Sequence, residues 1–167
     1  IPDLDLLDAE LPSTAVMEAR ARAAEQAGLA VKGVSKSGGA SASAGIGGMV
    51  LVTSHGFHGA YLSSSQSVSM TAIAGTGTGM ERDYDFSSVL HASDLDAPEK
   101  IGRSAGERTV KRLNPQKVAT TKVPVVFDPR IANSLVNHLA GAINGAAVAR
   151  KTSFLRDRLG QRLFAAG

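Results

Sequence analysis

The 167-residue chain contains no cysteine and no tryptophan. Without cysteine, neither a disulfide framework nor a thiolate metal site can form within these residues, and a reducing compartment is compatible with the composition. No apolar run approaches the roughly 20 residues that a membrane-spanning helix needs, and the N-terminus carries no signal-peptide pattern. We therefore expect a cytoplasmic chain that does not enter a membrane.

Aromatic residues are also scarce, at 4% of the chain, and the net charge is only +3, with the cations spread along the sequence. Surfaces that bind nucleic acid usually combine a basic stripe with aromatic side chains, and the sequence offers no such combination. Direct nucleic-acid binding is therefore not expected. The hydrophobic content of 43% suffices for one ordinary core, which favours a single domain over residues 1–167.

Between residues 30 and 90 the sequence alternates with a period of two and is broken by glycines. Val68, Met70 and Ala72 alternate with serine and threonine, as in strands that have one wetter face. Glycine-containing clusters at 54–57 and 75–79 predict turns. Together the spacing predicts an antiparallel meander of about four strands.

The small residues at 37–48 allow a second interpretation, a flexible low-complexity linker. Strand structure is favoured, because Val34, Ile46 and Val50 recur as strand-like anchors around this stretch. A strand face made of small side chains can pack closely against a second layer or a partner. This stretch is therefore a place to look for an interface, including self-association.

Three helices are expected, near residues 13–28, 97–113 and 129–148. A short edge strand at 123–127 should precede the third helix, because Pro124 cannot donate to a central ladder. Strands followed by helices of this kind indicate an α+β fold. Each helix begins at an N-cap signal, and proline follows the cap in the second and third: Ser13 or Thr14, Asp96 with Pro98, and Asp128 with Pro129.

Three sequence features could carry chemistry. His55 and His58 lie three residues apart in a predicted turn, but no third metal ligand can be identified beside them. The glycine-rich run at 75–79 lacks the Gly-Lys-Ser/Thr that opens a phosphate-binding helix. Glu81, Asp83 and Asp85 alternate, so a strand would place them on one face; such a row could bind a cation, but a charged sheet edge is the favoured interpretation.

The third helix has the layout of a metal site without the ligands. A catalytic metal needs at least two strong ligands from His, Cys, Asp or Glu, and between Arg130 and Ala149 the only such residue is His138.

Five blocks in order resemble the TldD/PmbA family, on the PmbA side, which is also called TldE. The resemblance extends from about Val31 to Phe164. The blocks are His55-Gly-Phe57, Gly75-Thr-Gly-Thr-Gly-Met-Glu-Arg-Asp-Tyr-Asp85, Pro124-Val-Val-Phe-Asp-Pro129, Leu139-Ala-Gly-Ala-Ile143 and Thr152-Ser-Phe-Leu155.

The resemblance implies that the chain is a central fragment, since family members are considerably longer. TldD and PmbA proteins look like the two subunits of a zinc-dependent peptidase of the bacterial cytoplasm. The family is linked to the maturation of peptide antibiotics and to the degradation of antitoxin peptides. Its older label, modulator of DNA gyrase, does not argue for contact with DNA.

TldD-type subunits carry His-Glu-x-x-x-His on the third helix, where the two histidines bind zinc and the glutamate activates water. With Gly141 as the anchor, the corresponding positions here are Asn137, His138 and Ala142. The resemblance therefore implies no catalytic or metal residue in this chain, with zinc expected in a TldD-like partner and peptides as substrates. Asn137, His138, Gly141 and Asn144 would then mark a vestigial site that faces a cavity.

Two other classes of function stay open at this point. One is an autonomous metal-dependent hydrolase that uses Glu81, Asp83 and Asp85, or a shifted metal site with His55 or His58. The other is a self-associating or DNA-gyrase-related interaction module.

Overall fold

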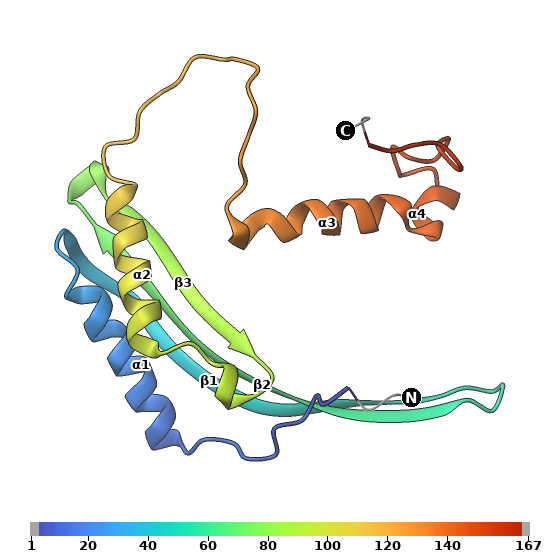
Figure 1. The fold of residues 1–167 in the computed structure, drawn as a ribbon, viewed down its shortest axis with the longest axis horizontal. Coiled ribbons are helices and arrows are strands. Elements are labelled where there is room, and N and C mark those ends of the chain that lie inside the picture. The colour runs from blue at the N-terminus through green and yellow to red at the C-terminus, as the bar shows by residue number, and fades with distance from the viewer. Residues whose placement is uncertain (1–3, 165–167) are drawn as a thin grey trace. The chain divides into compact units, whose positions relative to one another are not determined.

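The structure is a computed structural model that describes residues 4–164. The chain divides into two compact units, Ile1–Lys117 and Val118–Gly167. The single domain expected over residues 1–167 stays a prediction. The first unit holds α1 (Thr14–Leu29), β1 (Val34–Val52), β2 (His58–Ala74), β3 (Glu81–Val89) and α2 (Pro98–Lys111), and the second holds α3 (Pro129–Ile143) and α4 (Gly145–Ala149) (Figure 1).

The three strands form one antiparallel sheet in the order β1-β2-β3. This confirms the α+β class, but the described residues contain three strands where about four were predicted. The small residues at 37–48, for which a flexible linker was the second interpretation, lie within one strand of 19 residues, as the favoured interpretation predicted. Register shifts next to Ser37, with Gly39 at a φ of 114°, take up the irregularity as a bulge, and the strand continues.

The helices α1 and α2 pack on one face of the sheet (Figure 1). Val68, Met70 and Ala72 of β2 point toward them and are fully buried, together with Ala24 of α1 and Ala105 of α2. These residues have the period of two that the sequence predicted. Because most side chains in the layer are small, the helices lie close to each other and to the sheet.

Two of the three predicted helix caps, those of α1 and α3, agree with the structure, and the third does not. Ser13 accepts the amide hydrogen of Val16 at 3.4 Å and caps α1, which confirms that prediction. The capping role predicted for Asp96 is wrong, because α2 begins at an Ala97 cap that makes no side-chain bond. The Asp96 carboxylate instead accepts from Nζ of Lys100 at 2.6 Å.

The strand predicted at 123–127 is also wrong, since these residues form no ladder. Pro124 lacks an amide hydrogen, and the structure assigns no strand to the described part of the second unit, so no partner is available there.

None of the helices within residues 4–164 is long and apolar enough to cross a bilayer.

Residues 4–12 run along the sheet before α1 begins. The Ser64 amide donates to the Leu6 carbonyl at 2.9 Å. The Asp8 carboxylate accepts from the Ala92 amide at 2.8 Å, which holds the pKa of Asp8 below its ordinary value of 3.8. The His91 ring bonds the backbone carbonyl of Asp5 at 2.8 Å, and this bond raises the pKa of His91 above its ordinary value of 6.5.

These two pKa shifts predict that the segment is held best between about pH 4 and pH 6.5. A raised histidine pKa contributes stability that is present below 6.5 and is lost as the pH rises through the folded value. A lowered aspartate pKa contributes stability that is lost as the pH falls below 3.8 through the folded value.

Hydrogen exchange at the Ser64 amide checks this prediction, because that amide bonds the segment itself. Its protection factor should fall as the pH rises above neutrality. In the His91→Asn variant the Ser64 amide should already have a low protection factor below pH 6.5, and this factor should not decrease further above neutral pH. In the His55→Asn variant, whose substitution lies in the exposed hairpin turn, the Ser64 amide should behave as in the native protein. An unchanged fall in His91→Asn would contradict the assignment.

Candidate functional site

Helix α3 carries the three positions that the family motif singles out. Asp128 caps it by accepting the Arg130 amide hydrogen at 2.9 Å, and Pro129 occupies its first turn, so the predicted start is confirmed. The predicted end near residue 148 is wrong. The helix stops at Ile143, because the Asn144 side chain accepts from the amides of Ala146 and Ala147 and begins α4.

The motif positions do not share one side of α3. Residues 137 and 142 are five apart, so in a regular α-helix their side chains diverge by about 140°. Accordingly, Asn137 and His138 are exposed, whereas Ala142 is 7% exposed. His138 therefore does not pack inside a helix interface among residues 4–164.

Ala142 is held against the segment that follows α4. The Ser153 hydroxyl donates to the Ala142 carbonyl at 2.6 Å and accepts the Leu155 amide hydrogen at 3.0 Å, and Ser153 is itself buried. The methyl group of Ala142 therefore lies where the chain turns back on the helix. A histidine side chain at position 142 is larger than the alanine methyl group and would need additional space at this buried position.

These residues do not fit a zinc ion. Asn137 is a weak ligand, Ala142 has no ligand atom, and His138 lies alone on the exposed side of the helix. Residues 4–164 contain no group of three or more His, Cys, Asp or Glu side chains placed to hold a metal. Asn144, expected beside a vestigial site, has a structural role as the cap of α4.

The other candidate metal ligands lie far from α3 in sequence, at the β1–β2 hairpin. His55 is in the turn and His58 is the first residue of β2, and both are exposed. The glycine run at 75–79 forms the turn between β2 and β3 and leads into a strand, as its sequence indicated. It therefore lacks the helix that a phosphate-binding loop needs.

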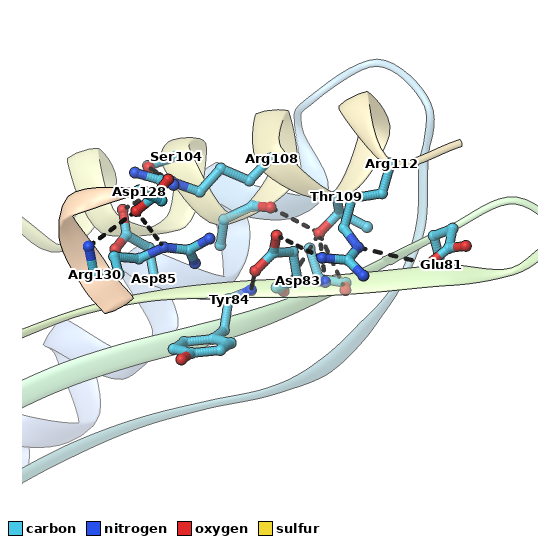
Figure 2. A network of polar contacts seen from close by, with 12 residues as sticks. Glu81, Asp83, Tyr84, Asp85, Ser104, Arg108, Thr109, Arg112, Asp128 and Arg130 are labelled. Carbon is cyan, nitrogen blue, oxygen red and sulfur yellow. Dashed lines mark hydrogen bonds and ion pairs between the residues drawn. The ribbon is translucent and has the colours of Figure 1, made fainter. Parts of the chain in front are cut away.

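The acidic row lies on one face of β3, as predicted, and that face is turned toward α2 (Figure 2). Nε of Arg112 lies 3.6 Å from Oε2 of Glu81, and Nη1 of Arg112 lies 3.7 Å from Oδ2 of Asp83. Nε of Arg108 lies 3.8 Å from Oδ2 of Asp85. The row lies on an edge strand of the sheet, as the favoured interpretation has it, but Asp83 is only 9% exposed, so the carboxylates form a partly buried contact between strand and helix. Arg108 of α2 and Arg112, the residue that follows the helix, thus occupy the place of a cation.

Thr109 joins the same strand and helix and is fully buried. Its hydroxyl accepts the Asp83 amide hydrogen at 3.0 Å and lies 2.7 Å from the Ala105 carbonyl, to which it donates (Figure 2). Thr109 follows Ile101 and Ala105 at a spacing of four residues, so the sequence places it on the apolar stripe of the helix but gives no sign of this bond. The available signal was a polar threonine at helical spacing among alanine and isoleucine, because a buried hydroxyl group normally has a hydrogen-bond partner.

Comparison with known proteins assigns both units to one family. The model of the PmbA/TldA metallopeptidase central domain matches residues 6–113, and the model of the C-terminal domain matches residues 120–167. The Escherichia coli O157:H7 metalloprotease PmbA is 40% identical over 163 residues, and a PmbA homolog of Haemophilus influenzae is 37% identical over 163 residues. Each alignment covers 97% of this chain and 36% of the relative, so the chain spans about a third of their length.

Solved structures agree with this assignment. A Bacteroides thetaiotaomicron protein named for modulation of DNA gyrase has a TM-score of 0.88 and 29% identity, over 96% of this chain and 37% of its own. A Thermotoga maritima protein with a similar name has a TM-score of 0.85 at 16% identity, again over 96% and 37%, and shows the fold alone. The family models and the relatives together establish that the chain belongs to the PmbA/TldA metallopeptidase family, which is the family that the sequence resembles.

Proposed function

We propose that this chain is the central part of a PmbA-type, non-catalytic subunit of a two-subunit peptidase. The zinc ion and the general base would belong to a TldD-like partner. The observation that carries the proposal is the state of the motif positions: Asn137 and His138 are exposed, Ala142 is buried, and residues 4–164 place no group of three or more ligand side chains to hold a metal. Family membership supplies the peptidase context.

The subunit would act by pairing with the catalytic chain and closing the space in which peptides are cleaved. Such a chamber restricts access to small or unfolded peptides, which fits a role in peptide maturation or antitoxin degradation. The compartment would be the cytoplasm. The alternative of an autonomous hydrolase on β3 gains no support, because Arg108 and Arg112 lie against the carboxylates of that strand.

Reconstitution of the two full-length subunits tests this proposal. Cleavage of an unfolded peptide should be absent with the PmbA-type subunit alone and should appear after mixing with the TldD-like subunit. Replacement of the zinc-binding histidines of the TldD-like subunit should abolish it.

Two matched variants of the PmbA-type chain sharpen the test. His138→Ala and Asn137→Ala change neighbouring exposed residues of α3, and both mixtures should keep the native rate. Cleavage by the PmbA-type subunit alone, or a loss of cleavage confined to His138→Ala, would overturn the non-catalytic assignment.

A further inference from the structure

Strand β3 forms one edge of the sheet. The strand order is β1-β2-β3, and within residues 4–164 only β2 pairs with β3. An edge strand presents amide and carbonyl groups that have no ladder partner, and another strand can pair with them. A strand of nine residues at an edge therefore needs some feature that prevents such pairing.

The amides of Tyr84 and Phe86 belong to this edge. Residues of an antiparallel strand alternate between those that exchange both backbone hydrogen bonds with the neighbouring strand and those whose amide and carbonyl point away from it. Asp83 is of the first kind, because the Thr109 hydroxyl lies 3.0 Å from its amide nitrogen and 3.3 Å from the carbonyl oxygen of its β2 partner Ala72. Those two backbone groups are thus directed toward each other. By the alternation, Tyr84 and Phe86 turn their amides away from β2.

Both outward amides already have a hydrogen-bond partner, and in each case it is the preceding aspartate. The Tyr84 amide donates to Oδ1 of Asp83 at 2.8 Å (Figure 2). The Phe86 amide donates to Oδ1 of Asp85 at 3.0 Å. Hydrogen bonds that a carboxylate accepts are stronger than those between neutral groups. Two of the donors that an added strand would use are therefore occupied.

Two arginines hold the carboxylates in this orientation. Oδ2 of Asp83 faces Nη1 of Arg112, and Oδ2 of Asp85 faces Nε of Arg108. Each carboxylate thus directs one oxygen to an arginine and the other to the edge of β3. Both aspartate side chains are largely buried, so little water competes for these oxygens.

We propose that Asp83 and Asp85 close the edge of β3 by accepting its outward amide hydrogens, so that no further strand adds to the sheet on this side. An incoming strand would have to displace both carboxylates, and its carbonyl oxygens would approach their negative charges. The carboxylates therefore act through hydrogen bonds as well as through their charge. This proposal does not depend on the role of the chain in a peptidase.

Hydrogen exchange of the full-length protein tests the bond at Phe86, with each rate divided by the intrinsic rate of the same sequence. Asp85→Ala should accelerate exchange at the Phe86 amide roughly 10-fold, because its hydrogen bond to the carboxylate is lost. Asp85→Asn keeps an acceptor oxygen in the same place and should retain most of the protection.

Asp96→Ala is the matched control. The Asp96 carboxylate pairs with Lys100 and accepts no amide hydrogen within residues 4–164, so its loss should leave the Phe86 rate unchanged. Equal acceleration by Asp85→Ala and Asp96→Ala would contradict the proposal, because the effect would then come from a general loosening of the fold. An unchanged rate in Asp85→Ala would mean that another strand, from the rest of the protein or from a second copy, holds the Phe86 amide, and would overturn it.

Sedimentation velocity of the same full-length variants tests whether the edge is closed. The native protein, Asp85→Asn and Asp96→Ala should share one distribution of species. Asp85→Ala should gain larger species as its concentration rises, because its opened edge can pair with that of another molecule. Faster exchange at Phe86 without any added association would show that the carboxylates do not keep strands away, and the proposal would fail.

Discussion

Gly102→Ala is expected to lower the free energy of unfolding of the first unit by about 3 kcal/mol. A Cβ atom at Gly102 would lie 1.9 Å from the Ala24 carbonyl oxygen and 3.0 Å from the Gly28 nitrogen, and both are backbone atoms of α1. Backbone in a helix cannot rotate aside as a side chain can, so α1 and α2 would have to separate. Urea unfolding followed by circular dichroism gives the loss.

Gly141→Ala is the control for this variant. Gly141 also lies in a helix, but a Cβ there would meet no atom within 4 Å. Alanine is the better helix former, so this change should be neutral or should stabilise α3 by about 0.5–1 kcal/mol. A tolerated alanine at Gly102 would mean that the two helices are not in backbone contact in solution.

Thr109→Val should cost the next largest amount, about 2 kcal/mol. Valine has nearly the shape of threonine but cannot accept the Asp83 amide hydrogen, which would remain buried without that bond between strand and helix. Thr109→Ser keeps the hydroxyl and loses one methyl group, at about 0.8 kcal/mol. The same urea titration measures both.

The order of the two losses is what tests the role of the hydroxyl. If serine proved more damaging than valine, the buried methyl group would matter more than the bond to Asp83, and the contact of α2 with β3 would be apolar in origin.

Much of the first unit could be predicted from local patterns. The alternation at Val68, Met70 and Ala72 marked the buried face of β2, and Ser13 marked the start of α1. These predictions succeeded because strand periodicity and helix capping depend on neighbours in the sequence. The prediction at Asp96 failed because a carboxylate with a lysine four residues away has an alternative to capping.

Strand count and pairing were harder to predict, because they depend on distant residues. The glycines of β1 interrupt the alternation in the sequence, but pairing with the whole of β2 carries the strand through a bulge at Gly39. The apolar run at 123–127 resembles a strand locally and has no ladder partner among the described residues. Sequence alone does not say whether a partner strand is present.

The features of the candidate site also fall into those that the sequence predicted and those that it did not. The shortage of ligands on the third helix was visible in the sequence, and the resemblance assigned it to Asn137, His138 and Ala142. The bond from Ser153 to the Ala142 carbonyl was not predicted, because it joins two segments through a turn of the chain. The contacts of Arg108 and Arg112 with the β3 carboxylates were not predicted, since helix periodicity does not reveal which charges meet a strand.

Zinc analysis of the full-length protein tests the central claim most directly. The protein should be purified apart from any TldD-like subunit, loaded with zinc, dialysed and measured for metal per chain, and then measured again after complex formation. The account predicts zinc far below one per PmbA-type chain and about one for each TldD-like chain in the complex. One zinc bound per isolated PmbA-type chain, and lost when His138 or the pair His55 and His58 is replaced, would contradict it.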